Sequence, residues 1–388
     1  MRYLSGGESH GPCLTCIVEG LPAGLELKKS DLDRHLQRRQ HGYGRGARMA
    51  IEKDRVEILS GLRFGRTIGS PLTLQVKNRD WENWKELMAP EGREPPNLVS
   101  LTRPRPGHAD LAGGLKYDYD DLRLVLERSS ARETAIRVAA GSVGRILLEK
   151  FGFRFYSHVV RIGSVEAAVP AGELSALADR IENSPLSCAD PLAEEAMLKE
   201  IEKAKDEGDT LGGIVEVVIT DITPGLGSYM HWDCRLDGKL AGAIMSIQGI
   251  KGVEIGAGFE GAGRPGSMLH DPIVIGKTGS ITRSSNRAGG LEGGVTNGQP
   301  LILRAAMKPI PTLADPLPSV DWKTGREAPG ATERSDVCAV PAAAVVVEAA
   351  AAWELAVAFR EKFAGDFIEE VEAAYRFYMD RVGKRLRY

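Results

Sequence analysis

The chain has 388 residues, enough for two or three domains of average size or for one large one. Its hydrophobic fraction of 43% and charged fraction of 27% exclude wholesale disorder. With 50 Lys+Arg against 53 Asp+Glu the net charge is −3, which argues against a dedicated nucleic-acid binder. No apolar signal segment opens the chain, and no second pair completes a zinc pattern after Cys13 and Cys16, so we expect a cytoplasmic protein without a metal site.

Secondary-structure signals in the first half follow a definite order. They are a strand with a Pro/Gly turn at 17–25, a short helix around 32–36, strands at 56–58 and 69–74, and a long helix from about 130 to 151. The same order returns roughly 200 residues later, at 214–227, 236–240, 253–255 and 298–303, followed by a long helix ending at 362–363. This recurrence predicts an internal duplication.

The duplication predicts one α+β domain over 1–388, with pseudo-repeats at about 1–152 and 210–365. The expected architecture is a β-α-β sandwich with pseudo-twofold symmetry, in which long central helices are flanked by antiparallel sheets. Insertions at about 77–127 and 171–209 interrupt the two repeats. The most apolar stretch, 337–359, carries two glutamates and predicts a buried helix instead of a membrane span.

Three short motifs match familiar signatures without their structural context. GESHG at 7–11 matches the nucleophile elbow of serine hydrolases, with Ser9 as nucleophile, but a strand-like segment follows where the elbow needs a helix. GAGFEG at 256–261 matches a dinucleotide fingerprint, but the Gly/Pro-rich sequence after it predicts a loop. GKT at 276–278 lacks the first glycine of a Walker loop. A hydrolase is the alternative enzyme class.

Arginines concentrate between residues 34 and 66. The glycine loop HGYGRGAR carries Arg45 and Arg48, and Arg39 precedes it. Guanidinium groups offer paired donors that match carboxylates and phosphates. The neighbouring glycines favour side chains that close over a small anion, and a solvated basic face is the plain alternative.

The segment ERSSARET at 127–134 predicts the start of the long helix, because Ser130 and Glu133 have the spacing of a capping box. The backbone N–H groups at that helix end would lie beside Arg128 and Arg132, an arrangement that favours anion binding. A plain helix cap explains the serine and the glutamate but not the two arginines.

Two histidines and one aspartate are candidates for proton transfer. His10 in GESHGP and His108 in RPRPGHADLAGG stand in Gly/Pro-rich loops, positions that suit ligand contact, although a lone histidine is more often structural. Asp336 shortly precedes the second long helix, where a carboxylate can cap the helix or act as a base. A non-catalytic anion- or flavin-binding protein would keep the arginines without needing the histidines.

Several stretches, taken together, resemble the chorismate synthase family. They are GESHGP, RRQHGYGRGARM, RPGHADLAG, RSSARETAIRVAAG, IKGVEIGAGF, SSNRAGGLEGGVTNGQPL, KPIPT and RSDVCAVPAA, in this order over nearly the whole chain. The resemblance implies a lyase of the shikimate pathway. It would convert 5-enolpyruvylshikimate 3-phosphate to chorismate and phosphate by a 1,4-trans elimination that requires reduced FMN without net redox change.

The resemblance also implies roles for individual residues. His10 would place a proton on the reduced flavin, His108 would protonate the substrate phosphate, and Asp336 would help the flavin's central-ring nitrogen to remove the carbon-6 hydrogen. Arg39 and Arg45 match NADP positions and are expected to face the substrate, with Ser9, Arg48 and Arg132 grouped with them. The implied FMN contacts are Arg128, Ser129, Ser130, Gln248, Gly249, Gly293, Lys308, Pro309, Ile310, Pro311, Thr312 and Arg334.

The partners implied by the resemblance are a small phosphorylated substrate and three further copies of the chain. The resemblance associates the family with FMN and, as related cofactors, FAD and NADP, and NADPH is the candidate flavin reductant. No nucleic acid or membrane partner is expected. The sequence leaves open whether the chain reduces its own flavin or depends on an external reductant.

Overall fold

The computed structural model describes residues 1–46, 52–96, 98–168, 174–277, 279–333 and 335–387. A first antiparallel sheet has the strand order β1 (Arg2–Gly6), β2 (Cys13–Glu19), β6 (Leu72–Lys77) and β3 (Val56–Ser60). In β2 the side chains of Leu14, Cys16 and Val18 are buried while their neighbours are more exposed, the alternation expected of a strand with one face on the core.

A second antiparallel sheet has the order β8 (Val165–Glu166), β7 (Arg154–Ile162), β9 (Gly213–Thr220), β15 (Leu301–Met307) and β10 (Ile250–Ile255). Apart from β8, its strands follow the chain in the same pattern as the first sheet: the first and second strands pair, and the last strand lies between the second and the third. Short hairpins accompany both sheets, β4 (Leu62–Arg63) with β5 (Arg66–Thr67) and β13 (Leu291–Glu292) with β14 (Val295–Thr296).

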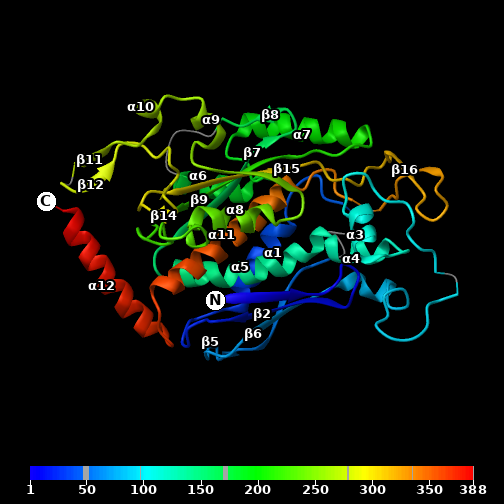
Figure 1. Cartoon of the computed structure of the whole chain (residues 1–388), viewed down its shortest axis with the longest axis horizontal. Coiled ribbons are helices and arrows are strands. Elements are labelled where there is room, and N and C mark those ends of the chain that lie inside the picture. The colour runs from blue at the N-terminus through cyan, green and yellow to red at the C-terminus, as the bar shows by residue number, and fades with distance from the viewer. Residues whose placement is uncertain (47–51, 97, 169–173, 278, 334, 388) are drawn as a thin grey trace.

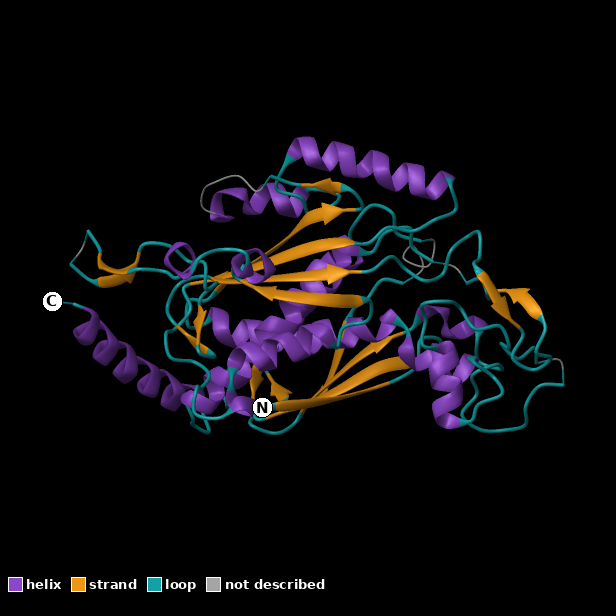
Figure 2. Cartoon of the chain, turned by 45° about the horizontal axis from the view of Figure 1, so that its top comes forward, coloured by secondary structure: helices purple, strands orange, loops and turns teal. Residues whose placement is uncertain are grey.

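Two long helices, α5 (Thr134–Glu149) and α11 (Val340–Lys362), lie between the sheets (Figure 2). They approach closely, because a Cβ on Gly141 would lie 2.6 Å from the carbonyl carbon of Ala349. Helix α11 is long and apolar enough to cross a membrane, but 83% of its most apolar window is buried inside the protein. The prediction of a buried helix at 337–359 is therefore confirmed.

Two shorter helices, α1 (Lys29–Gln40) and α8 (Leu236–Met245), pack against this central pair, as Figure 1 shows. Both were predicted from the leucine spacing. Their leucines are buried in the core: Leu32, Leu36, Leu236 and Leu240.

The two predicted insertions contain local helices. Residues 77–127 form the 3-10 helix η1 (Arg79–Asn83), helix α3 (Asp110–Tyr117) and most of α4 (Arg123–Ser129). In 171–209 the structure has α6 (Leu174–Asn183) and α7 (Pro191–Asp206). Asp190 caps α7 by accepting hydrogen bonds from the backbone of Leu192 and Ala193.

One end of the molecule projects from the body (Figure 1). Helix α12 (Ile368–Leu386) buries only Ile368 and Val371 among its described residues. Near its end Arg387 bridges to Ser280, beside the hairpin of β11 (Ile273–Ile275) and β12 (Ile281–Arg283). The described residues also form α9 (Gly258–Ala262), α10 (Gly266–Leu269), β16 (Pro318–Val320), β17 (Glu327–Pro329) and the 3-10 helix η3 (Trp232–Cys234).

The start of α5 differs from the capping-box prediction. Ser130 caps a 3-10 turn (η2, Ala131–Glu133) by accepting from the backbone N–H of Arg132, and α5 begins only at Thr134. The carboxylate of Glu133 instead accepts from Ser5 and Gln248, so the reciprocal bond of a capping box is not formed. Arg128 lies in the preceding helix α4 and not on the first turn of α5.

Two further local predictions are corrected. GAGFEG does not form a plain loop, because the short helix α9 follows β10. A Cβ on Gly256 would overlap backbone atoms of Arg287 and Gly289, so this glycine permits close chain packing. The second long helix begins at Val340 with Ala339 as its N-cap, which shows that Asp336 does not cap it.

Candidate active site

His10 lies in the loop between β1 and β2, where Glu127 of α4 holds it at two points. One carboxylate oxygen of Glu127 accepts from the His10 backbone N–H at 2.7 Å, and the other is 2.8 Å from Nδ1 of the ring. A carboxylate only accepts hydrogen bonds, so the shared proton belongs to Nδ1. The indole of Trp84 stacks on the ring at 4.1 Å between centroids.

Glu127 is 2% exposed, so its charge must be compensated inside the protein. Burial alone would raise the pKa of Glu127, but hydrogen bonds and charge from His10, aided by Arg123, lower it below the usual range. Arg123 lies 3.6 Å from Glu127 and 2.8 Å from Glu333, and its guanidinium is 5.0 Å from the Trp84 ring centroid. The predicted proton donor therefore sits beside an ionised acid.

His108 is also paired with a buried carboxylate, that of Asp110. Its Nδ1 is 2.6 Å from Oδ1 of Asp110, and Arg105 donates to both oxygens of that carboxylate at 2.8 and 2.9 Å. Burial would raise the pKa of Asp110, but hydrogen bonds from His108 and Arg105 hold it well below its ordinary value. Asp110 is fully buried while the His108 side chain is 15% exposed, so the imidazole is the member of this group that a ligand reaches.

Contacts connect the His108 loop to the predicted flavin residues near 308–312. Arg105 donates to the hydroxyl of Thr312 at 3.2 Å, and the Lys308 ammonium donates to the carbonyl of Gly107. The backbone N–H of Lys308 also donates to the carbonyl of Gly249 at 2.9 Å. Segments some 60 and 200 residues apart in sequence are thereby joined side by side.

The same series of contacts continues to Arg128. Gln248 donates to Glu133 at 3.2 Å, Glu133 accepts from Ser5 at 3.1 Å, and Arg128 donates to the Ser5 hydroxyl at 3.2 Å. Among the described residues, Oε1 of Gln248 is buried without a hydrogen-bond partner. An unsatisfied buried acceptor of this kind can be satisfied by a donor on a ligand. We call Arg128, Ser129, Ser130, Gln248, Gly249 and Lys308 to Thr312 the flavin wall, after the FMN contacts that the family resemblance predicts for them.

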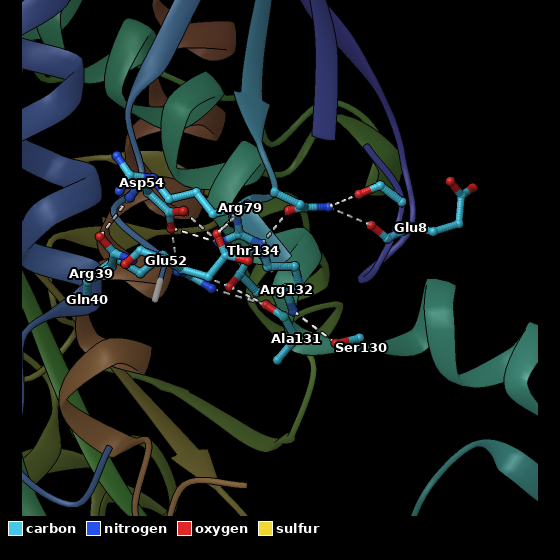
Figure 3. A network of polar contacts seen from close by, with 12 residues as sticks. Glu8, Arg39, Gln40, Glu52, Asp54, Arg79, Ser130, Ala131, Arg132 and Thr134 are labelled. Carbon is cyan, nitrogen blue, oxygen red and sulfur yellow. Dashed lines mark hydrogen bonds and ion pairs between the residues drawn. The ribbon is translucent and has the colours of Figure 1, made fainter. Parts of the chain in front are cut away.

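Arg39 and Arg132 form a buried network with Asp54 (Figure 3). Arg132 donates to both oxygens of Asp54 at 2.7 and 2.9 Å, and Arg39 donates to one of them at 3.2 Å. Burial lowers the pKa of Arg39 to about 10 despite the charge of Asp54, so it remains charged at neutral pH. Both arginines, at 4% and 5% exposure, act as internal supports in this structure rather than as open ligand contacts.

This network also holds the loop that carries His10. Arg132 donates through Nε to the side-chain oxygen of Asn78 at 2.8 Å, and the amide nitrogen of Asn78 donates to the carbonyls of Glu8 and Gly11. Ser9 in the same loop is 2% exposed, and its backbone N–H donates to the carbonyl of Glu127. Strand β2 and not a helix follows, which excludes a nucleophile elbow at Ser9.

Asp336 meets the glycine loop. One of its oxygens is 2.9 Å from Nη1 of Arg45, and the other accepts from the backbone N–H of Gly46 at 2.6 Å. The backbone N–H of Val337 donates to the carbonyl of Gly44 at 2.9 Å, so the segment that carries Asp336 also contacts the glycine loop through its backbone. The structure thus joins one predicted base to one predicted anion-binding arginine.

The other predicted site residues lie outside the described residues, in the β13–β14 turn or in the 308–312 segment. Arg48 and Arg334 lie outside the described residues. Gly293 occupies the β13–β14 turn near Tyr229, and the contacts described here do not connect it to the flavin wall. In the 308–312 segment, Ile310 accepts from Thr210 through its carbonyl, while Pro309 and Pro311 lie on either side of it.

Sequence reasoning did not find five of the residues described above. Their charge or aromatic character shows in the sequence, but their burial and their partners do not. The spacing of Asp110 two residues after His108 was the one local signal available. The residues are Glu127, Asp110, Trp84, Arg105 and Asp54.

Comparisons with known proteins identify the family of the chain. The family model described as chorismate synthase matches residues 1–359. The chain is 57% identical over 382 residues to the chorismate synthase of Desulforudis audaxviator, covering 98% of each chain, and 58% identical over 385 residues to that of Moorella thermoacetica, covering 98% of this chain and 100% of the relative. A crystal structure of chorismate synthase superposes with a TM-score of 0.80 at 42% identity, over 98% of both chains. The chain therefore belongs to the chorismate synthase family, the shikimate-pathway lyases that convert 5-enolpyruvylshikimate 3-phosphate to chorismate and phosphate.

Proposed function

We propose that the chain carries out this elimination with reduced FMN bound along the flavin wall. The residues fit an anionic, hydrogen-bonding cofactor, because Gln248 keeps an unsatisfied buried acceptor and Arg128 and Lys308 supply positive charge along the same series of contacts. When bound there, reduced FMN would lend electron density to the reacting substrate with no net redox change. FAD is not part of this proposal.

The substrate carries a phosphate and two carboxylates, so its binding needs several cations. Arg45 is proposed as one of them, with Asp336 holding its guanidinium in place. His108 is proposed to give a proton to the departing phosphate, and His10 is proposed to hold a proton at the flavin. Asp336 is proposed to assist removal of the carbon-6 hydrogen. Arg39, Arg48, Arg132, Gly293 and Arg334 stay in the proposal on the resemblance alone.

The observation that carries this proposal is the matched setting of the two histidines. Each has its Nδ1 within 2.8 Å of a buried carboxylate, and each carboxylate has an arginine beside it. A carboxylate in this position fixes the tautomer and orientation of an imidazole that transfers protons. His10 and His108 differ from the other paired histidines in that the resemblance assigns each of them a proton transfer.

The test of the proposed function is an anaerobic assay with dithionite-reduced FMN and 5-enolpyruvylshikimate 3-phosphate. We expect chorismate absorbance to appear with reduced FMN and to be absent with oxidised FMN. Turnover that is equal with oxidised FMN would contradict the cofactor proposal.

The histidine roles are tested by His10→Ala and His108→Ala. We expect each change to lower turnover by roughly 10- to 10⁴-fold with FMN binding retained, the range that loss of a general acid–base group produces. His231→Ala is the matched control, because His231 also pairs with an acid, Asp233, but on an exposed loop. Wild-type turnover in both site variants would remove the histidines from the mechanism.

NADPH is proposed as the reductant of the bound flavin. Loss of NADPH absorbance in the presence of the chain and FMN, without any other enzyme, tests this step. If NADPH is not consumed while dithionite supports turnover, the reductant must come from another protein.

We further propose that the chain works as a cytoplasmic homotetramer and that its fold is a duplicated β-α-β sandwich in one domain. The equivalent strand orders of the two sheets and the paired long helices between them support the duplication. Exposed apolar side chains at the projecting end and in the short helices α9 and α10 support self-association: Phe259, Met268, Ile273, Ile275 and Phe377, each more than half exposed.

A further inference from the structure

We propose that Glu127 and Trp84 are positioning residues for His10, which they hold in one orientation and one tautomer. The inference rests on the proposed role of His10 as a proton carrier. Both residues belong to the insertion at 77–127, so the proposal also gives that insertion a purpose. Neither residue is expected to touch the reacting atoms.

Glu127 fixes both the backbone and the ring of His10. Its two oxygens accept from two different groups of the same residue, at 2.7 and 2.8 Å. Its own backbone carbonyl accepts from Ser9 at 3.0 Å, which ties the loop to α4 a third time. A side chain held at both its backbone and its ring nitrogen has little freedom to change rotamer.

Trp84 limits the remaining motion by covering one face of the imidazole. The two ring planes are 30° apart, with centroids separated by 4.1 Å. Trp84 is itself held, because its indole N–H donates to the buried Asp80 at 3.3 Å and the guanidinium of Arg123 packs on its ring. Asp80 and Arg123, which both belong to the insertion at 77–127, therefore fix the position of Trp84.

The comparison with Glu216 separates a positioning role from ordinary burial. Glu216 is also a buried carboxylate beside a buried histidine, His158, at 3.2 Å, and it also has an arginine, Arg304, at 2.7 Å. This group lies on the second sheet, and none of its members is among the predicted site residues. Like the Glu127 group, it consists of a buried carboxylate that contacts both a histidine and an arginine. No role in the reaction is proposed for its histidine.

The experiment compares Glu127→Gln with Glu216→Gln. Glutamine has one acceptor oxygen, so Glu127→Gln loses one of the two bonds to His10 while keeping the side-chain shape. We expect kcat to fall by roughly 10- to 100-fold with KM and FMN affinity changed by less than about threefold. Glu216→Gln should lose comparable thermal stability but keep wild-type kcat.

A double-mutant cycle shows whether Glu127 acts through His10. In the His10→Ala background, Glu127→Gln should lower kcat by no more than about twofold, because the residue it positions is gone. A full additional loss there would show that Glu127 acts independently and would overturn the proposal. If His10→Ala alone leaves turnover intact, the proposed role of His10 fails instead, so the two failures are distinguishable.

Substitution of Trp84 gives a separate test. Trp84→Phe keeps an aromatic face against His10 and should retain kcat within about threefold, whereas Trp84→Leu should lower it by roughly tenfold or more. Both variants remove the bond to Asp80, so that loss is common to them. Equal kcat values in the two variants would show that stacking on His10 does not matter.

Discussion

Asp336 lies 2.9 Å from Arg45 and accepts from the Gly46 backbone at 2.6 Å, and it precedes α11 without capping it. This arrangement removes the helix-cap explanation for the residue. An ionised carboxylate paired with a charged arginine can both orient that arginine and accept a proton during reaction. A neutral replacement removes both uses at once.

Asp336→Asn should lower turnover by at least about a hundredfold while folding and FMN binding stay close to wild type. Asparagine keeps an oxygen that can accept from Gly46 but cannot act as a base. Steady-state kinetics with flavin titration measures the effect, and Asp233→Asn, at an exposed acid beside His231, is the control. Near wild-type turnover would leave the base unidentified.

At the scale of elements, the contact between α5 and α11 is set by small residues. A Cβ on Gly141 would overlap the carbonyl of Ala349, whereas a Cβ on Gly242, in the exposed part of α8, meets nothing within 4 Å. Gly141→Ala should therefore destabilise the fold by about 1–3 kcal/mol through overpacking. Gly242→Ala should stabilise it by up to about 1 kcal/mol through helix propensity. Urea unfolding of both variants checks this, and equal effects would contradict it.

The same helix layer contains a buried charge cluster. Glu348 of α11 accepts from Arg38 at 2.7 and 3.0 Å and from Ser157 at 2.7 Å, and it also pairs with Arg145. Burial would raise the pKa of Glu348, but Arg38 and Arg145 hold it well below its ordinary value. For the neighbouring His35 burial has the opposite effect: it lowers the pKa to about 3, so this histidine is neutral.

Glu348→Gln should cost about 3–5 kcal/mol of unfolding free energy at neutral pH, because two arginines lose their buried counter-charge. The folded pKa of Glu348 is depressed, so its contribution is complete above the unfolded pKa of about 4.3 and declines as the pH falls further. The unfolding free energies of wild type and variant should therefore approach each other as the pH falls from about 4.3 toward 3, without becoming equal there, because the folded pKa of Glu348 is lower still. A difference that stays constant in this range would argue against an ionised Glu348.

At the scale of the whole molecule, the projecting end formed by α12 and the β11–β12 hairpin (Figure 1) carries exposed apolar side chains. Ile273 and Ile275 are 68% and 69% exposed on one strand. Solvent-exposed apolar strands favour pairing or packing with another chain. This end is therefore the proposed contact between copies.

Sedimentation of the wild-type chain should give a mass of four 41.9 kDa chains. The double variant Ile273→Asp with Ile275→Asp should give smaller species, since two buried charges would oppose association. Leu192→Asp is the control, because Leu192 of α7 is itself 80% exposed, and it should sediment as wild type. A wild-type monomer would contradict the proposed tetramer, and an unchanged double variant would move the contact elsewhere.

Local patterns in the sequence determined the elements and the family. The alternation of Leu14, Cys16 and Val18 and the leucine spacing of α1 and α8 depend on neighbours a few residues away, so they could be read directly. The motifs that indicated the chorismate synthase family are also short stretches of continuous sequence, so they could be recognised without the structure. The helix start at Ser130 was placed too early, because the partners of Glu133 are Ser5 and Gln248, more than a hundred residues away.

Only the tertiary structure decided which partner each charged residue has. Arg132 and Arg45 look alike in sequence, yet Arg132 is buried against Asp54, 78 residues away, while Arg45 meets Asp336. Likewise Glu127 reaches His10 across 117 residues. An ion pair is set by the distance between two groups in space, and that distance follows from how the sheets and helices pack rather than from either local sequence.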